Sequence, residues 1–137
     1  MEKAVVIIKP DGMKKNIIGE IISRFEKEGF SLVGLKMVSL TTELLETWYA
    51  HHKDKPFFPE LRDFMQESPV VSMVVSGDNV VSRVREMCGP TNSKEAPKGT
   101  IRGDFGEDIQ RNIIHASDSV ESADREIEIM FEPHELF

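Results

Sequence analysis

The chain has 137 residues, of which 39% are hydrophobic and 30% charged, a balance typical of a globular protein. This length suffices for one domain with its own hydrophobic core. The single cysteine, Cys88, excludes an intrachain disulfide and a multi-cysteine metal site. We therefore expect residues 1–137 to form a single domain, and the cysteine usage fits a reducing compartment.

The charge balance limits the partners of the protein. Seventeen basic and 24 acidic residues give a net charge of −7 with neutral histidine, so the average surface repels nucleic acid and anionic membranes. The N-terminus lacks the features of a secretory signal, and no apolar run approaches the length of a membrane span. We expect a cytoplasmic protein that binds neither a membrane nor a specific nucleic acid, and any polyanionic ligand must bind in a local basic pocket.

The first quarter of the chain shows a strand pattern and then a helix pattern. Residues 4–8 form a continuous, mostly β-branched run, which predicts a buried strand that ends in a turn at Lys9-Pro10-Asp11-Gly12. Apolar residues then recur at helical spacing between Asn16, a candidate N-cap, and the stop signal Gly29. This order predicts a strand followed by an amphipathic helix.

A period of two returns over residues 31–40 and predicts a second strand with one face buried. Thr41 or Thr42 can cap a helix that extends to about residue 50. A further short helix follows the turn at Pro56-Phe57-Phe58-Pro59. The two faces of the second strand carry Val33, Leu35 and Met37 on one side and Leu32, Gly34 and Lys36 on the other.

The second half of the chain again begins with a strand pattern followed by a helix pattern, and a long loop comes after them. Residues 70–75 predict a third buried strand, and Asp78 or Asn79 can cap a helix that ends at Gly89. The stretch from Gly89 to Arg111 is rich in glycine and poor in aliphatic residues. A loop of this length in a small domain is usually functional or disordered.

A short strand at residues 112–115 and a last helix capped by Asp118 or Ser119 complete the chain. Without the helical insertion after the second strand and without the last helix, the order is β-α-β-β-α-β, the split pattern of ferredoxin-like folds. We therefore predict an α/β (α+β) fold in which helices cover a four-stranded antiparallel sheet, with the long loop before the last strand. Such folds host many unrelated activities, so the topology alone assigns no chemistry.

His115 is a candidate for chemistry because it ends an apolar strand and precedes a polar turn into a helix. An imidazole is a competent nucleophile near neutral pH when a neighbouring group fixes its tautomer. A carboxylate of the next helix, Glu121, Asp124 or Glu126, can accept its other ring proton. The same spacing also suits a histidine that is merely hydrogen-bonded in a strand-to-helix turn.

Basic side chains occur at the end of the first strand and in the long loop. Lys9 follows five apolar residues, where it can face a ligand or simply extend to solvent. The loop combines cations and hydroxyl groups that suit phosphate oxygens, and a solvated loop whose cations balance nearby acids explains them equally. These loop residues are Thr91, Asn92, Lys94, Lys98, Thr100, Arg102 and Arg111. Neither a P-loop nor a G-x-G-x-x-G motif is present, so phosphate would be bound by a loop and scattered cations.

Residues 112–119, Asn-Ile-Ile-His-Ala-Ser-Asp-Ser, resemble the signature N-x-x-H-x-S-D-[SA] of nucleoside diphosphate kinases. Further blocks similar to that family follow in family order along the whole chain. They include Lys9-Pro10-Asp11-Gly12, Ser68-Pro69-Val70-Val71 and Gly99-Thr100-Ile101-Arg102-Gly103-Asp104-Phe105. Several independent motifs make the resemblance specific, whereas His115 alone does not.

The resemblance implies a phosphotransferase with a ping-pong mechanism. His115 would take the γ-phosphate of a nucleoside triphosphate, become a phosphohistidine and pass the phosphate to a nucleoside diphosphate. Glu126 matches the carboxylate that orients the imidazole, and Ser117 matches the hydroxyl beside it. Lys9 and Tyr49 match the residues near the transferred phosphate, and Arg85, Thr91 and Arg102 match those that bind the remaining phosphates. Asn112 matches the sugar contact. Phe57 and Ile109 match the apolar pair around the base.

Magnesium is the implied cofactor. The sequence has no carboxylate cluster that builds an all-protein magnesium cage, so we expect Mg²⁺ to be carried by the nucleotide phosphates. A base held between aromatic and aliphatic faces is read with little selectivity, which predicts broad base specificity. The resemblance also implies a homo-oligomer, a hexamer or a tetramer built from a common dimer.

Two loop positions depart from the family pattern. Ser93 follows Thr91-Asn92 where the family often has proline, and Lys98 stands where proline often precedes Gly-Thr-Ile-Arg. Loss of a rigid loop proline should soften the loop and weaken subunit contacts or thermal resistance. The residues assigned to chemistry are unaffected.

A second class of function also fits the residues. A non-catalytic ferredoxin-like regulatory module that binds a nucleotide would keep the fold and the loop but would not need His115 with Glu126. A nucleic-acid regulator that uses the basic loop is disfavoured by the net charge of −7.

Overall fold

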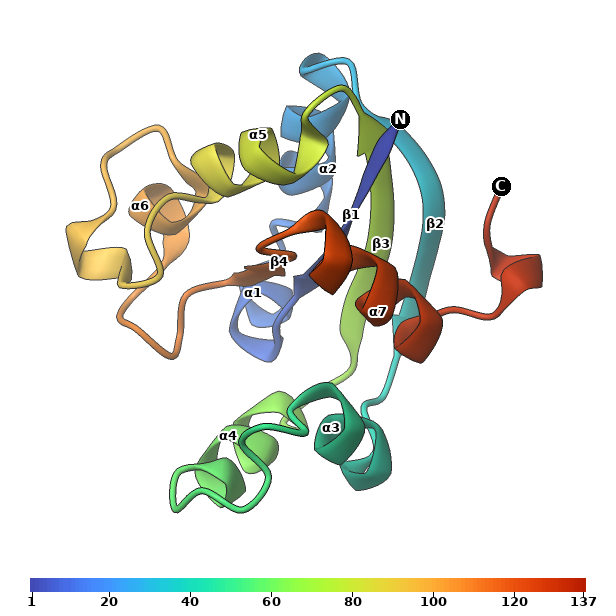
Figure 1. Cartoon of the computed structure of the whole chain (residues 1–137). Coiled ribbons are helices and arrows are strands. Elements are labelled where there is room, and N and C mark those ends of the chain that lie inside the picture. Colours follow the sequence, from blue (N-terminus) through green and yellow to red (C-terminus); the bar gives the residue numbers. More distant parts are fainter.

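The computed structural model describes all 137 residues and contains one four-stranded sheet with helices against both faces (Figure 1). The strands are β1 (Glu2–Ile8), β2 (Ser31–Val38), β3 (Val70–Gly77) and β4 (Ile114–Ala116). Their order across the sheet is β2-β3-β1-β4, and every neighbouring pair is antiparallel. The predicted ferredoxin-like α+β architecture is confirmed.

Seven α-helices connect and cover these strands. They are α1 (Pro10–Lys14), α2 (Ile18–Lys27), α3 (Thr42–Trp48), α4 (Phe58–Met65), α5 (Val80–Cys88), α6 (Ile101–Phe105) and α7 (Val120–Met130). Two short 3₁₀ helices span Ser93–Glu95 and Pro133–Glu135. None of the helices combines the length and the apolar character that crossing a bilayer requires.

Strand β1 is central in the sheet and buried on both faces, as its continuous apolar run predicts. Ala4, Val6 and Ile8 point into one core cluster with α2 and α5, whereas Val5 and Ile7 point into a second cluster with α3, α4 and α7. Each fully buried aliphatic side chain of this size contributes about 1.5–3 kcal/mol of transfer free energy. Both cores therefore fix the end of β1, where the candidate site begins.

The segment after β1 is a helix and not only a turn. Pro10 begins α1, because its fixed φ suits the first helical position and its missing N–H is not needed there. Asn16 is not the N-cap that the pattern suggests. It adopts a left-handed φ of 56° that reverses the chain, and α2 begins at Ile18 after Ile17.

Strand β2 has one covered face, but its coverage does not follow hydrophobicity. Leu35 and Met37 are 54% and 63% exposed, while Gly34 on the opposite face is buried under the C-terminal segment. A bulge between Leu32 and Gly34 interrupts the pairing with β3, and the strand ends at Val38 rather than at residue 40. As an edge strand, β2 leaves apolar side chains outside the core of the monomer.

The stretch from Gly89 to Arg111 is not structureless. It contains the Ser93–Glu95 turn and α6, whose N-cap Thr100 accepts a hydrogen bond from the backbone N–H of Gly103. Ser93 donates its backbone N–H to the carbonyl of Asp108 across the loop, a bond that a proline there could not make.

Of the four predicted helix caps, two form side-chain cap bonds. The hydroxyls of Thr41 and Ser119 accept hydrogen bonds from backbone N–H groups in the first turns of α3 and α7. Asn79 stands at the start of α5 in a left-handed conformation without a side-chain cap bond, and Glu2 accepts from Val81 instead. The last strand begins at Ile114 rather than at residue 112.

Candidate active site

Strand β4 presents His115 on the sheet face that α7 covers. Ile114 and Ala116 point into the opposite core cluster, so the period-two alternation of a strand directs the imidazole toward α7. Trp48 of α3 packs edge-on against the ring, with 5.3 Å between ring centroids. The ring is therefore held in a fixed position from three elements.

A buried carboxylate binds the imidazole. Oε1 of Glu126, on α7, lies 3.1 Å from Nε2 of His115 and accepts a 2.6 Å hydrogen bond from the hydroxyl of Ser117. The Ser117 oxygen in turn accepts the backbone N–H of Val5. Because a carboxylate only accepts hydrogen bonds, this contact assigns the ring proton to Nε2 and the lone pair to Nδ1. Of the three candidate partners, Glu126 is the one in contact with His115.

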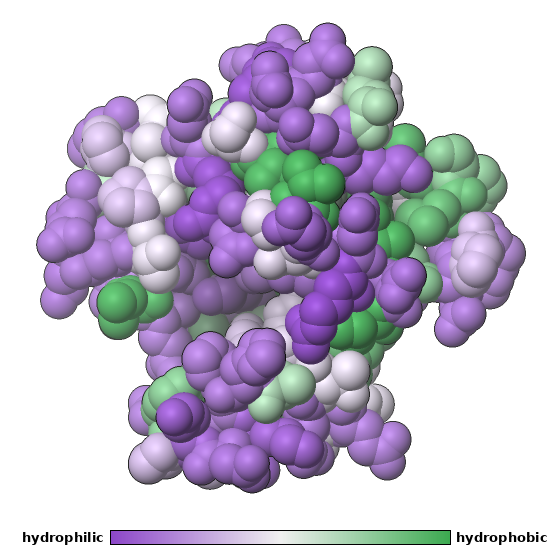
Figure 2. Space-filling model, viewed as in Figure 1, coloured by the Kyte–Doolittle hydropathy of each residue, from purple (hydrophilic) through white to green (hydrophobic).

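His115 opens into a cavity of about 310 Å³ that gathers most of the predicted site residues. The hollow lies between the α3–α4 pair and the loop that carries α6, and its surroundings are mainly hydrophilic (Figure 2). The predicted residues that line it are Lys9, Arg85, Thr91, Arg102, Asn112, His115 and Glu126. They come from the residue after β1, from α5, from the long loop with α6, from β4 and the segment just before it, and from α7, so the fold assembles them from distant parts of the chain.

Lys9 and Asn112 are linked at the end of β1. The Lys9 ammonium donates a 2.7 Å hydrogen bond to Oδ1 of Asn112, whose amide nitrogen donates to the carbonyls of Thr91 and Ile109. Burial and, to a smaller extent, the nearby Arg102 charge lower the pKa of Lys9 to about 8, against the opposing effect of Asp11. The cation is thus held in place and would be stabilised by an arriving anion.

Arg102 is fixed entirely by backbone carbonyl groups. Its guanidinium donates to Gly89 at 2.9 Å, to Ile114 at 2.7 Å and to Asn112 at 3.3 Å. Arg85 donates to the carbonyl of Ala116 at 3.3 Å. No carboxylate forms an ion pair with Arg85, Arg102 or Lys9, so three positive charges remain available to an anionic ligand.

The other loop cations do not join this cavity. Arg111 pairs with Glu67 at 3.0 Å and lies over the ring of Phe64, and Lys94 and Lys98 are not among the lining residues. Of the four basic loop residues, only Arg102 lines the cavity. The composition of the loop alone could not separate these roles.

Four predicted site residues lie outside the cavity lining. Ser117 is buried behind Glu126, and Tyr49 packs edge-on against Phe58 with its pKa raised to about 12 by burial and by the charge of Glu126. Phe57 and Ile109 are 50% and 64% exposed, on the α3–α4 segment and on the long loop. Their side chains stand at the surface and do not line the cavity.

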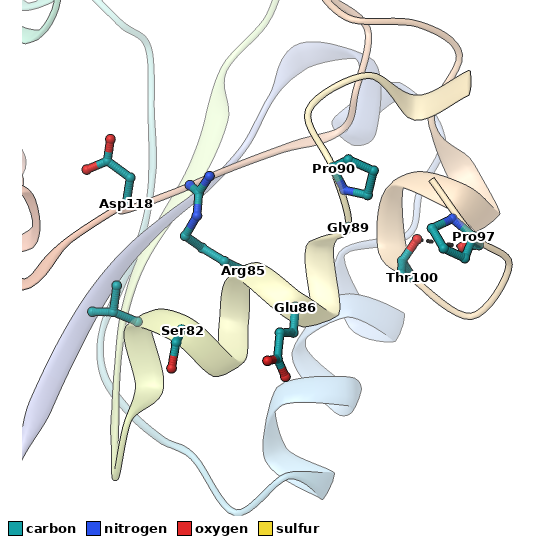
Figure 3. Close-up of a pocket in the computed structure, with 9 residues that line it drawn as sticks. Ser82, Arg85, Glu86, Gly89, Pro90, Pro97, Thr100 and Asp118 are labelled. Atoms are coloured by element: carbon teal, nitrogen blue, oxygen red, sulfur yellow. Dashed lines mark hydrogen bonds between the residues drawn. The ribbon is translucent and has the colours of Figure 1, made fainter. Parts of the chain in front are cut away.

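A larger groove of about 580 Å³ runs beside α5 and shares Arg85 and Asp118 with the cavity (Figure 3). In the close-up, Arg85 extends from α5 toward Asp118, while Glu86 points away from it. On one wall of the groove, the hydroxyl of Thr100 donates a hydrogen bond to the carbonyl of Pro97. Because no set of cations converges in this groove, the smaller cavity is the candidate active site.

Two further features of the site were not predicted. Asp118 and Ser122 line the cavity, although the sequence suggested only a capping role for Asp118. Asp11 accepts the backbone N–H of Ile113 beside the site; its place in the Lys9-Pro10-Asp11-Gly12 block was the available signal. No group of three or more histidine, cysteine or carboxylate side chains forms a metal site.

The carboxylate-bound histidine and the three cations without ion-pair partners form one cavity, which fits an enzyme that acts on phosphate groups. The family model described as "Nucleoside diphosphate kinase" matches residues 2–136. A nucleoside diphosphate kinase of Halalkalibacterium halodurans is 54% identical over 136 residues, which cover 99% of this chain and 92% of that protein. One of Carboxydothermus hydrogenoformans is 53% identical, with 99% and 91% covered.

Solved structures agree with these relatives. The nucleoside diphosphate kinase of Aquifex aeolicus superposes with a TM-score of 0.95 at 45% identity and covers 99% of each chain. A nucleoside diphosphate kinase of Halobacterium salinarum in complex with CDP has a TM-score of 0.95 at 40% identity, covering 99% of this chain and 91% of that chain. This chain therefore belongs to the nucleoside diphosphate kinase family.

Family membership confirms the predicted activity. The protein is an enzyme that moves the γ-phosphate of a nucleoside triphosphate to a nucleoside diphosphate by a ping-pong mechanism through a phosphohistidine. Nothing in the comparisons supports the non-catalytic regulatory module.

Proposed function

We propose that His115 carries the transferred phosphate on Nδ1. The observation that supports this assignment most strongly is the 3.1 Å contact between Nε2 and Glu126, since it leaves Nδ1 as the nitrogen with a lone pair. Nδ1 has no hydrogen bond within the chain, and the ring lines the cavity. A preset tautomer removes the need to reorient the imidazole during the reaction.

In the first half-reaction, the Nδ1 lone pair forms a bond to the γ-phosphorus. The bond from that phosphorus to the β–γ bridging oxygen breaks, and the nucleoside diphosphate leaves with the electron pair. The carboxylate of Glu126 stabilises the positive charge that develops on the ring, and Ser117 holds that carboxylate. A second nucleoside diphosphate then reverses these steps and regenerates the free histidine.

Three cations of the cavity compensate the phosphate charge in this proposal. Lys9 is assigned to the transferred phosphate, and Arg85 and Arg102, with Thr91, are assigned to the other phosphates. Support comes from their convergence on one cavity without ion-pair partners. Phosphate transfer depends on positioned charge more than on covalent chemistry, so these fixed cations supply much of what the reaction needs.

The remaining assignments describe the nucleoside end. Asn112 is assigned to the sugar, Phe57 and Ile109 to the two faces of the base, and Tyr49 to the surroundings of the transferred phosphate. The exposure of Phe57 and Ile109 supports a base site that forms around the ligand. Apolar faces bind every base through stacking, so we infer broad base specificity.

We infer that Mg²⁺ is the metal and that it reaches the site on the nucleotide phosphates. Two carboxylates line the cavity, Asp118 and Glu126, and Glu126 is already hydrogen-bonded to His115 and Ser117, so the cavity has no carboxylate cage for a metal. A bound magnesium ion would neutralise phosphate charge and retain water ligands, which suits a cavity that supplies cations rather than a carboxylate cage.

We also propose that residues 1–137 act as a single domain in a homo-oligomer, a hexamer or a tetramer, in the cytoplasm. The exposed apolar side chains of Leu35 and Met37 on the edge strand β2 support a subunit contact there, because an apolar edge invites pairing. Sedimentation analysis of the wild-type protein and of Met37→Lys measures the assembly. The proposal requires the charged variant to dissociate more readily.

Incubation with γ-labelled ATP tests the assignment of His115. We expect an acid-labile, base-stable phosphoprotein that a nucleoside diphosphate discharges, and no labelled protein for His115→Ala. Labelling of the His115→Ala variant to the wild-type level would refute the assignment.

A further inference from the structure

An unusual backbone turn connects Asn112 with His115. Ile113 has a φ of 76°, and the N–H of Ile114 donates a 2.9 Å hydrogen bond to the carbonyl of Asn112. These two observations describe a γ-turn with a positive central φ, which is a rare and strained type. Strain is greatest for a β-branched residue such as isoleucine, so the surroundings must hold this turn.

The segment that follows β1 holds both peptide groups of Ile113. Oδ2 of Asp11 accepts the N–H of Ile113 at 2.8 Å, and the N–H of Lys9 donates to the carbonyl of Ile113 at 2.8 Å. A Cβ at Gly12 would lie 3.0 Å from that carbonyl and 2.9 Å from Ile8, so glycine permits this close approach. The turn is thus clamped by side-chain and backbone groups of one short segment.

Burying the Asp11 carboxylate at this position is energetically unfavourable. Only 4% of the residue is exposed, and Oδ1 has no hydrogen-bond partner although it is buried. A buried carboxylate oxygen without a partner destabilises the fold. The one hydrogen bond that the Asp11 side chain makes goes to the strained turn, so its role depends on the groups that this turn positions.

The γ-turn determines how the two ends of the site are spaced. Asn112, before the turn, holds the Lys9 ammonium, and the carbonyl of Ile114, after it, holds the Arg102 guanidinium. His115 follows directly. We propose that Asp11 is a positioning residue that holds the Ile113 turn and so aligns Asn112 and His115 for phosphate transfer. This inference rests on the roles proposed above for His115 and Asn112.

The test compares the rate of single-turnover phosphorylation by γ-labelled ATP in full-length variants, at a temperature where each is folded. Asp11→Ala removes the acceptor, and we expect phosphorylation to slow by about ten- to a hundredfold, which is the rate loss that a slightly misplaced reacting group causes. Asp11→Asn keeps an acceptor oxygen, and we expect its rate to lie within about threefold of wild type on the same principle of alignment. The matched control is Val75→Ala, a buried β3 change opposite Ala4, which should lower the thermal midpoint and leave the rate unchanged.

A wild-type rate in folded Asp11→Ala would overturn the inference, as would a rate in Asp11→Asn as slow as that in Asp11→Ala. If Asp11→Ala does not fold, Asp11→Asn decides the question through hydrogen exchange. A protected Ile113 amide together with fast phosphorylation supports the inference, and a protected amide with slow phosphorylation contradicts it. A labelled His115→Ala variant would instead overturn the proposed function, so the two failures are distinguishable.

Discussion

The two ends of the proposed nucleotide site are built differently. At the phosphate end, Lys9, Arg102, His115 and Glu126 are held in place by hydrogen bonds to other residues of the chain. At the base end, the assigned side chains project from surface segments and are half or more exposed; they are Phe57 and Ile109.

This difference separates catalysis from recognition. Charges and ring orientation must be correct to within a fraction of an ångström for phosphate transfer, so the cavity groups are fixed in advance. Base stacking tolerates variation, so the base end needs only two apolar surfaces. Changes at the phosphate end should therefore affect the rate, and changes at the base end should affect apparent affinity.

The largest effect is expected for His115→Ala. The variant lacks the phosphate carrier, so turnover should be abolished, while nucleotide affinity stays within severalfold of wild type because the cations remain. Steady-state kinetics together with equilibrium dialysis of ADP measures the two quantities. Retained turnover would contradict the assignment, and a complete loss of binding would show that the ring contributes mainly to affinity.

Glu126→Gln should have the next largest effect. Its amide can donate to Nε2 of His115 and favour the tautomer with the proton on Nδ1, which cannot attack phosphorus. We expect kcat to fall about a hundredfold, a rate loss of the size that follows when the proton sits on the wrong atom of a catalytic group. Glu128→Gln, on the exposed side of α7, is the matched control and should keep the wild-type kcat.

Lys9 gives the phosphate end a pH dependence. Since its folded pKa is about 8, the ammonium is lost as the pH rises through that value, and kcat/KM should fall there. The pKa of Lys9 in the folded protein lies below its ordinary value of 10.5. Between about pH 8 and 10.5 the unfolded chain therefore binds more protons than the folded chain, and the contribution of Lys9 to the free energy of unfolding rises with pH in that window. A Lys9→Met variant should lose this limb of the kcat/KM profile; a profile that keeps it would assign the limb to another group.

At the base end, Phe57→Ala should raise KM with little change in kcat. Loss of one stacking surface costs about 1 kcal/mol, or roughly a fivefold increase in KM. The increase should be similar for purine and pyrimidine substrates, because no hydrogen-bonding group is removed. A fall in kcat larger than the rise in KM would mean that the base end also aligns the phosphates.

The smallest effect is expected in the loop that links both ends. Ser93 is buried and its hydroxyl has no partner, so Ser93→Ala should raise the free energy of unfolding by about 1 kcal/mol. Thermal denaturation measures the change. A destabilised variant would show that the hydroxyl is bound in solution, for example by an ordered water.

The sequence predicted the parts of the fold whose patterns have one interpretation. β1 and most of β3 are apolar and buried on both faces, and the histidine signature includes the residue around which the candidate site is assembled. β2 was less predictable because an edge strand with a bulge leaves Leu35 and Met37 exposed. The short helices α1 and α6 begin beside proline and glycine, whose turn signals conceal five-residue helices.

Details of the site depended on contacts that spacing does not encode. Several carboxylates of α7 could have met His115, and the structure brings only Glu126 into contact. Likewise, Arg102 and Arg111 were equivalent in composition, yet one lines the cavity and the other pairs with Glu67. The γ-turn at Ile113 has no sequence signature because isoleucine rarely adopts a positive φ.

The most direct test of the central claim is to locate the phosphate on the trapped phosphoenzyme by ³¹P–¹⁵N NMR with ¹⁵N-labelled histidine. We expect one phosphorylated residue, His115, with phosphorus bonded to Nδ1 and the proton retained on Nε2. Phosphorus on Nε2, or on any other side chain, would contradict it.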